Sequence, residues 1–102
     1  MAFTIRHSRR FPVQCSVQYD AGPFRGHGIV WNLSMTGWRM SGDVPMHPGE
    51  TLALTVTLPS KERIAVSAAV VRWSRGSEFA VENVVMEPHT EARLRDYVTR
   101  LI

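Results

Sequence analysis

Hydrophobic and polar residues alternate along much of the chain, and this pattern is typical of β-strands that bury one face. In the first such stretch, PVQCSVQYD, Val13, Cys15, Val17 and Tyr19 share a face. Five further strands are expected at residues 25–31, 37–40, 51–58, 63–74 and 79–86. The intervening stretches are rich in Gly, Pro, Asn, Asp and Ser, which favour turns and loops. The pattern therefore predicts six short strands joined by turns.

The same alternation predicts which side chains point into the core. In the strand at 63–74, Ile64, Val66, Ala68 and Val70 are expected on one face, opposite Ala65 and its alternating neighbours. In the short strand at 37–40, two large apolar side chains are expected opposite a basic one: Trp38 and Met40 against Arg39.

Beyond residue 86 the spacing of apolar residues changes from a period of two to a helical period. Pro88 can open a helix, because its missing N–H has no partner there in any case. An apolar stripe at helical spacing follows, formed by Leu94, Tyr97, Val98, Leu101 and Ile102. The fold class predicted is mainly β: a small six-stranded antiparallel barrel, residues 12–86, with a C-terminal helix, residues 88–102, packed against it.

Length and composition agree with one globular domain that spans residues 1–102. The chain is 44% hydrophobic and 21% charged, ordinary values for a globular protein. No apolar run approaches the roughly 20 residues that cross a bilayer, and residues 1–10 lack the apolar stretch of a signal peptide. We expect a cytoplasmic protein without direct membrane insertion, in which the lone Cys15 is a small buried side chain.

Positive charge is concentrated in the N-terminal segment, residues 1–11, which we expect to be a flexible basic arm. Arg6, Arg9 and Arg10 all precede Asp20, the first acidic residue, although the formal net charge of the whole chain is only +3. A basic arm without nearby acidic residues attracts anions. Charge alone favours a merely solvated arm, as in most proteins with such a cluster, so the ligand has to be inferred from more specific motifs.

Catalytic and metal-binding motifs are absent from the sequence. It contains no GxSxG, HExxH or Walker-type motif, and its four histidines are widely dispersed, at His7, His27, His47 and His89. We therefore expect a binding protein rather than an enzyme, with no metal ion or cofactor.

Two short motifs have the chemistry of a guanine-binding site. Arg6 and Arg10 lie four residues apart, and an arginine fork matches the O6 and N7 acceptors of guanine while also pairing with phosphate. In NLSMTG, the Asn32 carbonyl and the Ser34 hydroxyl could accept hydrogen bonds from guanine N1–H and N2–H₂. Gly37 permits a tight turn or a close approach of the ligand. The alternative is that these three residues form only a polar turn.

Together the two motifs resemble those of the PilZ domain family, bacterial receptors for cyclic di-GMP. The family pattern RxxxR matches Arg6 and Arg10, and D/N-x-S-x-x-G matches Asn32, Ser34 and Gly37. The neighbouring sequences FPVQCSVQY, GWRM and AVVRWSRGSEFAVENV are also similar to the family, as is the final helix. The resemblance implies that cyclic di-GMP binds at these five residues and orders the arm. It further implies an effector protein in trans, in motility, secretion or exopolysaccharide machinery, and no DNA partner.

Four further residues near the motifs are given secondary or structural roles. Arg9 is a secondary candidate, as a contact to phosphate or solvent. Trp38 is the other secondary candidate, with core packing and base stacking both left open. We assign Trp31 and Trp73 to the core or the barrel rim, where tryptophans in short strands are usually found.

Three positions depart from the usual family pattern. Asn32 has one acceptor oxygen and no charge, whereas aspartate would offer two oxygens and a charge. Ala80 occupies a position where the family usually has glycine, and Asn83 one where an aromatic residue is usual. These departures leave open a protein-interaction module that binds no ligand. A third hypothesis, a basic barrel for single-stranded nucleic acid, is disfavoured by the low net charge and the dispersed glutamates.

Overall fold

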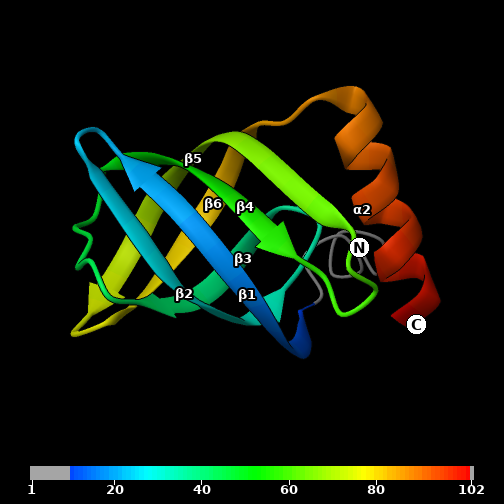
Figure 1. Cartoon of the computed structure of the whole chain (residues 1–102), viewed down its shortest axis with the longest axis horizontal. Helices are drawn as coiled ribbons and strands as arrows, with labels where there is room; N and C mark the ends of the chain where they lie inside the picture. Colours follow the sequence, from blue (N-terminus) through cyan, green and yellow to red (C-terminus); the bar gives the residue numbers. More distant parts are fainter. Residues whose placement is uncertain (1–9, 102) are drawn as a thin grey trace, which may run out of the picture.

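Six antiparallel strands close into a barrel with one helix at its end (Figure 1). The computed structural model describes residues 10–101. The strands are β1 (Phe11–Ala21), β2 (Phe24–Leu33), β3 (Gly37–Gly42), β4 (Thr51–Thr57), β5 (Arg63–Arg75) and β6 (Glu78–Val85), followed by helix α2 (Pro88–Leu101). Their order around the barrel is β1-β2-β3-β6-β5-β4, and pairing of β4 with β1 closes it. The predicted fold class is confirmed, and each strand end lies within two residues of its predicted position.

The predicted inward face of β1 is correct and lines the centre of the barrel. Cys15, Val17 and Tyr19 are buried, and Val13 is partly buried because the pairing with β2 is irregular beside it. The Tyr19 hydroxyl donates to the Val44 carbonyl at 2.7 Å and accepts from the Val44 N–H at 3.0 Å. This loop segment is thereby tied to the core, and burial raises the pKa of Tyr19.

The predicted inward face of β5 is wrong beyond Val66. Val66 is buried, but the next buried residues are Ala69 and Val71, whereas Ala68 and Val70 are only partly buried. The reason is an irregular register: β5 has one more residue than β4 between the pairs Val66 with Leu54 and Ala69 with Leu52. An extra residue of this kind shifts the alternation of a strand by one position.

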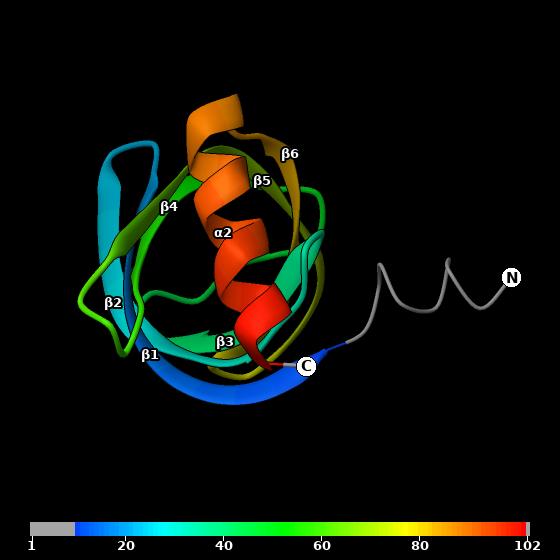
Figure 2. The ribbon, with the colours of Figure 1, turned by 90° about the vertical axis from the view of Figure 1, so that its right-hand side faces the viewer.

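Helix α2 lies across one end of the barrel (Figure 2). It begins at Pro88 as predicted, and its buried Leu94 and Val98 belong to the same hydrophobic core as the strands. The Arg93 guanidinium also donates to the main-chain carbonyl of Arg63 at the start of β5. The helix therefore covers apolar side chains that the open end of the barrel would otherwise expose to water.

The predicted arm falls almost entirely on residues 1–9, which lie outside the described residues. Phe11, placed in the arm by the sequence, is instead the first residue of β1 and is buried. Among residues 10–101, no helix is long and apolar enough to cross a membrane.

Candidate functional site

Two strand irregularities turn polar and aromatic side chains to the outer surface of the barrel. Met40 and Arg39 are consecutive on β3, but one residue, Trp31, separates their partners Val30 and Asn32 on β2. Trp31 is therefore an extra residue, and Asn32 also faces outward. In β5, Arg72 is likewise an extra residue opposite β6, and the next residue, Trp73, faces outward. Trp31 and Trp73 are therefore 37% and 40% exposed, although both are large apolar residues.

These outward residues fall in one row across four neighbouring strands. Asn32 of β2 pairs with Arg39 of β3, Arg39 pairs with Ala80 of β6, and Ala80 pairs with Trp73 of β5. Ala80, which lies between Arg39 and Trp73 in this row, is small and only 3% exposed. The row thus combines an amide, a guanidinium and an indole, which can hydrogen-bond, pair with an anion and stack on a base.

A depression of about 170 Å³ lies beside this row and contains parts of both sequence motifs. It is lined by Arg10, Thr36, Gly37, Arg72, Trp73, Ala80, Val81 and Glu82. Arg10 and Gly37 are separated by 27 positions in the chain, and the barrel brings them to one site. Arg72 and Glu82 form an ion pair at 2.6 Å, whereas no ion pair of Arg10 is found within residues 10–101. Arg10 is thus a cationic group available to an anionic ligand.

Ser34 shapes the motif turn from inside rather than presenting its hydroxyl at the surface. Its side chain is 1% exposed, and its Oγ accepts from the N–H groups of Gly37 at 3.1 Å and Thr36 at 3.3 Å. The hydroxyl also donates to the Gly37 carbonyl at 3.0 Å. These bonds use the acceptor capacity that we expected to meet guanine, so the observed contribution of Ser34 is to fix the loop.

Gly37 is required by the neighbouring strand. Its φ angle is not positive, but a Cβ at this position would collide with the main-chain carbonyl of Val81 on β6. The obstacle is backbone, which cannot turn aside as a flexible side chain can. Of the two roles expected for Gly37, the structure shows a close approach, and the neighbour is β6.

Trp38 is a core residue in this structure. It is 0% exposed, and its indole Nε1–H donates to Oδ1 of Asn83 at 2.6 Å. The Asn83 main-chain N–H in turn donates to the Thr36 carbonyl at 2.8 Å, so one residue of β6 holds both β3 and the motif turn. Of the roles left open for Trp38, core packing is the one that its burial supports.

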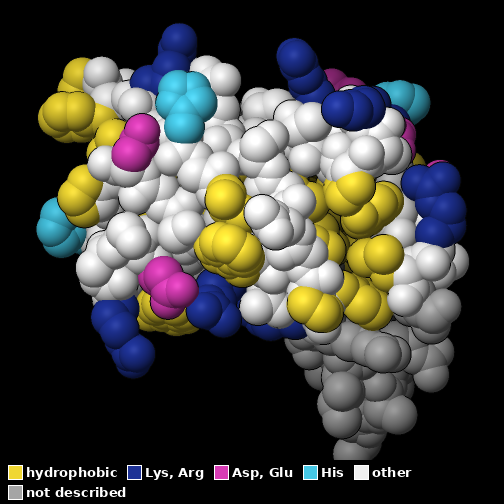
Figure 3. Space-filling model, turned by 60° about the horizontal axis from the view of Figure 1, so that its bottom comes forward, with side chains coloured by type: hydrophobic (Ala, Val, Ile, Leu, Met, Phe, Trp, Pro, Cys, Tyr) yellow, Lys and Arg dark blue, Asp and Glu magenta, His cyan; other side chains and the backbone are white. Residues whose placement is uncertain are grey.

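A second depression also borders the Trp73 side chain and lies toward the β5–β6 turn. It encloses about 600 Å³ and is lined by Arg39, Trp73, Ser74, Arg75 and Glu78. Arg39 and Glu78 form an ion pair at 3.0 Å, with 41% and 38% of their side chains exposed. Surface apolar groups bordered by basic side chains are also visible on the face shown in Figure 3.

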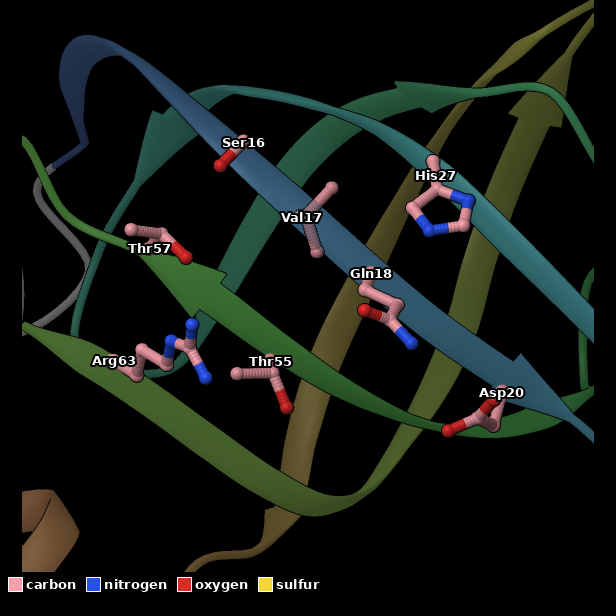
Figure 4. A pocket seen from close by; sticks show the side chains of 8 residues that line it. All are labelled: Ser16, Val17, Gln18, Asp20, His27, Thr55, Thr57 and Arg63. Atoms are coloured by element: carbon pink, nitrogen blue, oxygen red, sulfur yellow. The ribbon is translucent and has the colours of Figure 1, made fainter. Parts of the chain in front are cut away.

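A third depression lies on the outer surface of β1, β2, β4 and β5 and contains none of the predicted site residues. Its lining is mostly polar, from Ser16 and Gln18 to Thr55, Thr57 and Arg63 (Figure 4). No aromatic side chain other than the His27 imidazole is present to stack on a base. We therefore place the candidate site at Arg10 and Gly37. Among residues 10–101, no group of three or more potential metal ligands is found.

The structure brings some of the predicted site residues together and not others. Arg10 and Gly37 line one depression, Asn32 lies in the adjacent row, and Ser34 is buried beneath the turn. Arg6 and Arg9 lie outside the described residues. The sequence pattern predicts Trp73 in the core or at the rim and does not single out Arg72. An alternating pattern cannot show an extra residue in a strand, so the sequence carried no clear signal that both face the site.

Comparisons with known proteins agree with the fold. The solved structures that resemble the chain include the Bacillus subtilis inhibitor of motility MotI/DgrA, at 22% identity and a TM-score of 0.75, with 89% of this chain and 47% of that chain covered. The chain thus spans about half the length of MotI/DgrA. They also include the PilZ domain of CeSA from a cellulose-synthesizing bacterium, at 16% identity and a TM-score of 0.71, with 91% and 97% covered. A search of curated proteins gives no match.

A family model covers nearly the whole chain. The model of the PilZ domain matches residues 4–100, a span that contains the arm motif, the barrel and most of α2. PilZ domains bind cyclic di-GMP and generally act as binding or adaptor modules rather than as enzymes. On this evidence, the chain belongs to the PilZ domain family.

Proposed function

We propose that this protein is a cytoplasmic receptor for cyclic di-GMP that binds the dinucleotide between the N-terminal arginines and the NLSMTG turn. The observation that carries the proposal is the depression that Arg10 and Gly37 line together with the Trp73 indole. A guanidinium can bind the O6 and N7 edge of guanine or a phosphate, and an indole can stack on a purine face. The ligand carries two guanines and two phosphates, so it matches these groups.

The remaining motif residues have separate parts in the proposed site. Asn32 lies on the outer surface and presents its side chain beside Arg39, where the amide can pair with a base edge. Ser34 keeps the turn in shape, and Gly37 allows β3 to lie close to β6. Arg6 and Arg9 are proposed to close over the ligand from the arm, Arg6 as a base or phosphate contact and Arg9 as a phosphate contact.

The proposed output is a change in the surface offered to a partner protein. A ligand shifts the equilibrium between two states of the arm only if it binds those states with different affinities. An arm that contacts the ligand in one state provides such a difference. We propose a partner in trans that belongs to motility, secretion or exopolysaccharide machinery. MotI/DgrA, an inhibitor of motility, and the PilZ domain of CeSA provide precedents for two of these settings.

The proposal is tested by calorimetric titration of the whole chain with cyclic di-GMP and, separately, with GTP. Arg10→Ala and Asn32→Ala should each weaken binding of cyclic di-GMP about 10-fold or more, because a bidentate base contact contributes about 1–3 kcal/mol. Arg25→Ala is the matched control: Arg25 is an exposed arginine whose ion pair with Asp20 lies at the β1–β2 turn. Unchanged binding in both site variants would refute the site assignment.

A ligand-independent interaction module is the second candidate. It is favoured by the use of Ser34 and Gly37 within the barrel itself, since a fold that needs these residues keeps them even without a ligand. Calorimetric titration with cyclic di-GMP distinguishes these two candidate functions. A chain that binds no cyclic di-GMP, yet forms a stable complex with a protein partner, supports the module.

A further inference from the structure

The depression that contains Arg10 is too small for a whole cyclic dinucleotide. It encloses about 170 Å³, whereas pockets for drug-sized ligands measure about 300–1,000 Å³. The adjacent depression toward the β5–β6 turn encloses about 600 Å³, and the Trp73 side chain lines both. The two depressions therefore share one indole, and together they offer more space than the first depression alone.

We propose that this second depression is a guanine subsite, in which Glu78 recognises the second base of the dinucleotide. The proposal rests on the proposed function, because it concerns the same ligand. The Watson–Crick edge of guanine presents N1–H and N2–H₂, two donors on one side, and a carboxylate has two oxygens that can accept from both. Trp73 supplies an aromatic face against which a base can stack.

The register of the strands puts these groups within reach of one base. Ala80 pairs with Arg39 on one side and with Trp73 on the other, and Glu78 lies two residues along β6 from Ala80, on the same face. Because residues two apart on a strand share a face, the Glu78 carboxylate lies on the same side of the sheet as the Trp73 indole, and both residues line the second depression.

Little stability is lost when contacts to the ligand replace the Arg39–Glu78 ion pair. Both side chains are more than one-third exposed, and an ion pair in water at this level of exposure contributes little stability. When Glu78 accepts from guanine, the Arg39 guanidinium becomes available to a phosphate of the same ligand. Arg75 lines the depression as a second cation. The site thus offers an acceptor for the base and cations for the phosphates.

The test compares two ligands that differ in one base. Cyclic di-GMP and the hybrid cyclic GMP–AMP are titrated calorimetrically into the whole chain and into Glu78→Gln. Adenine lacks the N1–H donor, so the wild-type chain should bind cyclic di-GMP about 10-fold more tightly than the hybrid. Glu78→Gln should remove this preference by weakening cyclic di-GMP alone. Asp20→Asn, which breaks a similarly exposed ion pair at the β1–β2 turn, should preserve the preference.

Three results would overturn the proposal. The first is a wild-type chain that binds both ligands equally, the second is a Glu78→Gln variant that keeps the preference, and the third is a variant that weakens both ligands to the same extent. In each of these cases binding of cyclic di-GMP itself still supports the proposed function. If the wild-type chain binds neither dinucleotide, the proposed function fails and the subsite fails with it.

Discussion

Replacing Ser34 by alanine separates two roles for the serine of the NLSMTG turn. If the hydroxyl serves mainly to hold the turn, Ser34→Ala will lower the stability of the fold, with or without ligand. If it is a direct contact to guanine, the variant will lose affinity and keep its stability. The structure favours the first role, because the side chain is 1% exposed and its Oγ is bonded within the loop.

The size of the effect follows from the groups left without a partner. Alanine would leave the buried N–H of Gly37 without the acceptor that now lies at 3.1 Å, and an unsatisfied buried donor costs about 1–3 kcal/mol. The Thr36 N–H is nearer the surface, so water can replace most of its bond. The Gly37 carbonyl keeps the bond that it accepts from the Ser34 main chain at 3.0 Å. We therefore expect a loss of about 2 kcal/mol.

Thermal and urea unfolding, followed by circular dichroism without ligand, measure this loss. For a domain of this size, about 2 kcal/mol corresponds to a decrease in Tm of about 8–16 °C. Ser67→Ala is the matched control, because Ser67 is an exposed serine on β5 and should change stability by less than about 0.5 kcal/mol. A Ser34→Ala variant with wild-type Tm and weakened binding of cyclic di-GMP would refute the reasoning.

Three further predictions concern the barrel, the helix and the cysteine. Gly37→Ala should lower the free energy of unfolding, measured in urea, by about 1–3 kcal/mol, because the new Cβ meets the backbone of β6. The loss should be larger than for Gly49→Ala, whose φ of 91° is unfavourable but whose surroundings are open. Equal losses in the two variants would contradict the clash. Leu94→Ala should lower the free energy of unfolding by about 2–5 kcal/mol, and the same change at the exposed Leu101 should lower it much less. Similar losses in the two variants would mean that α2 does not cover the end of the barrel. Burial raises the pKa of Cys15 above its ordinary value of 9.0, so the folded state favours the neutral thiol. The buried thiol therefore contributes its full stabilisation below that value, and this stabilisation is lost as the pH rises. Between about pH 8 and about pH 10, the free energy of unfolding should fall less steeply for Cys15→Ala than for the wild-type chain. Equal slopes would contradict the raised pKa of Cys15.

The β-barrel could be predicted from the sequence because its strands alternate cleanly where they line the core. The face of β1 that includes Cys15, Val17 and Tyr19 is an example, since every other residue of this stretch is apolar and the intervening ones are polar. The stretch from Ala65 to Val71 in β5 lacks that contrast. Alanine and valine fit either face, so the sequence does not specify where the extra residue lies, and only the pairing with β4 and β6 determines it.

The sequence identifies the motif residues of the candidate site but not the side chains that surround them. Arg10 and Gly37 were identified from short sequence patterns, and the fold brings them to one depression. The inward direction of the Ser34 hydroxyl depends on how the turn closes on itself, which residue types do not reveal. The outward direction of Trp73 depends on the extra residue that precedes it. Both outcomes are set by backbone geometry.

The extra residue at Arg72 also determines how this surface can change during evolution. Val71 pairs with Val81 and Trp73 with Ala80, so deletion of Arg72 would leave a regular ladder in which Trp73 still faces outward. If Arg72 itself paired with Ala80, Trp73 would lie opposite the buried Phe79 and turn toward the interior without any substitution of the tryptophan. The position of the extra residue, rather than the length of the strand, therefore decides whether the indole is on the surface. When related chains are compared, that position is as informative about the site as the identity of the residues.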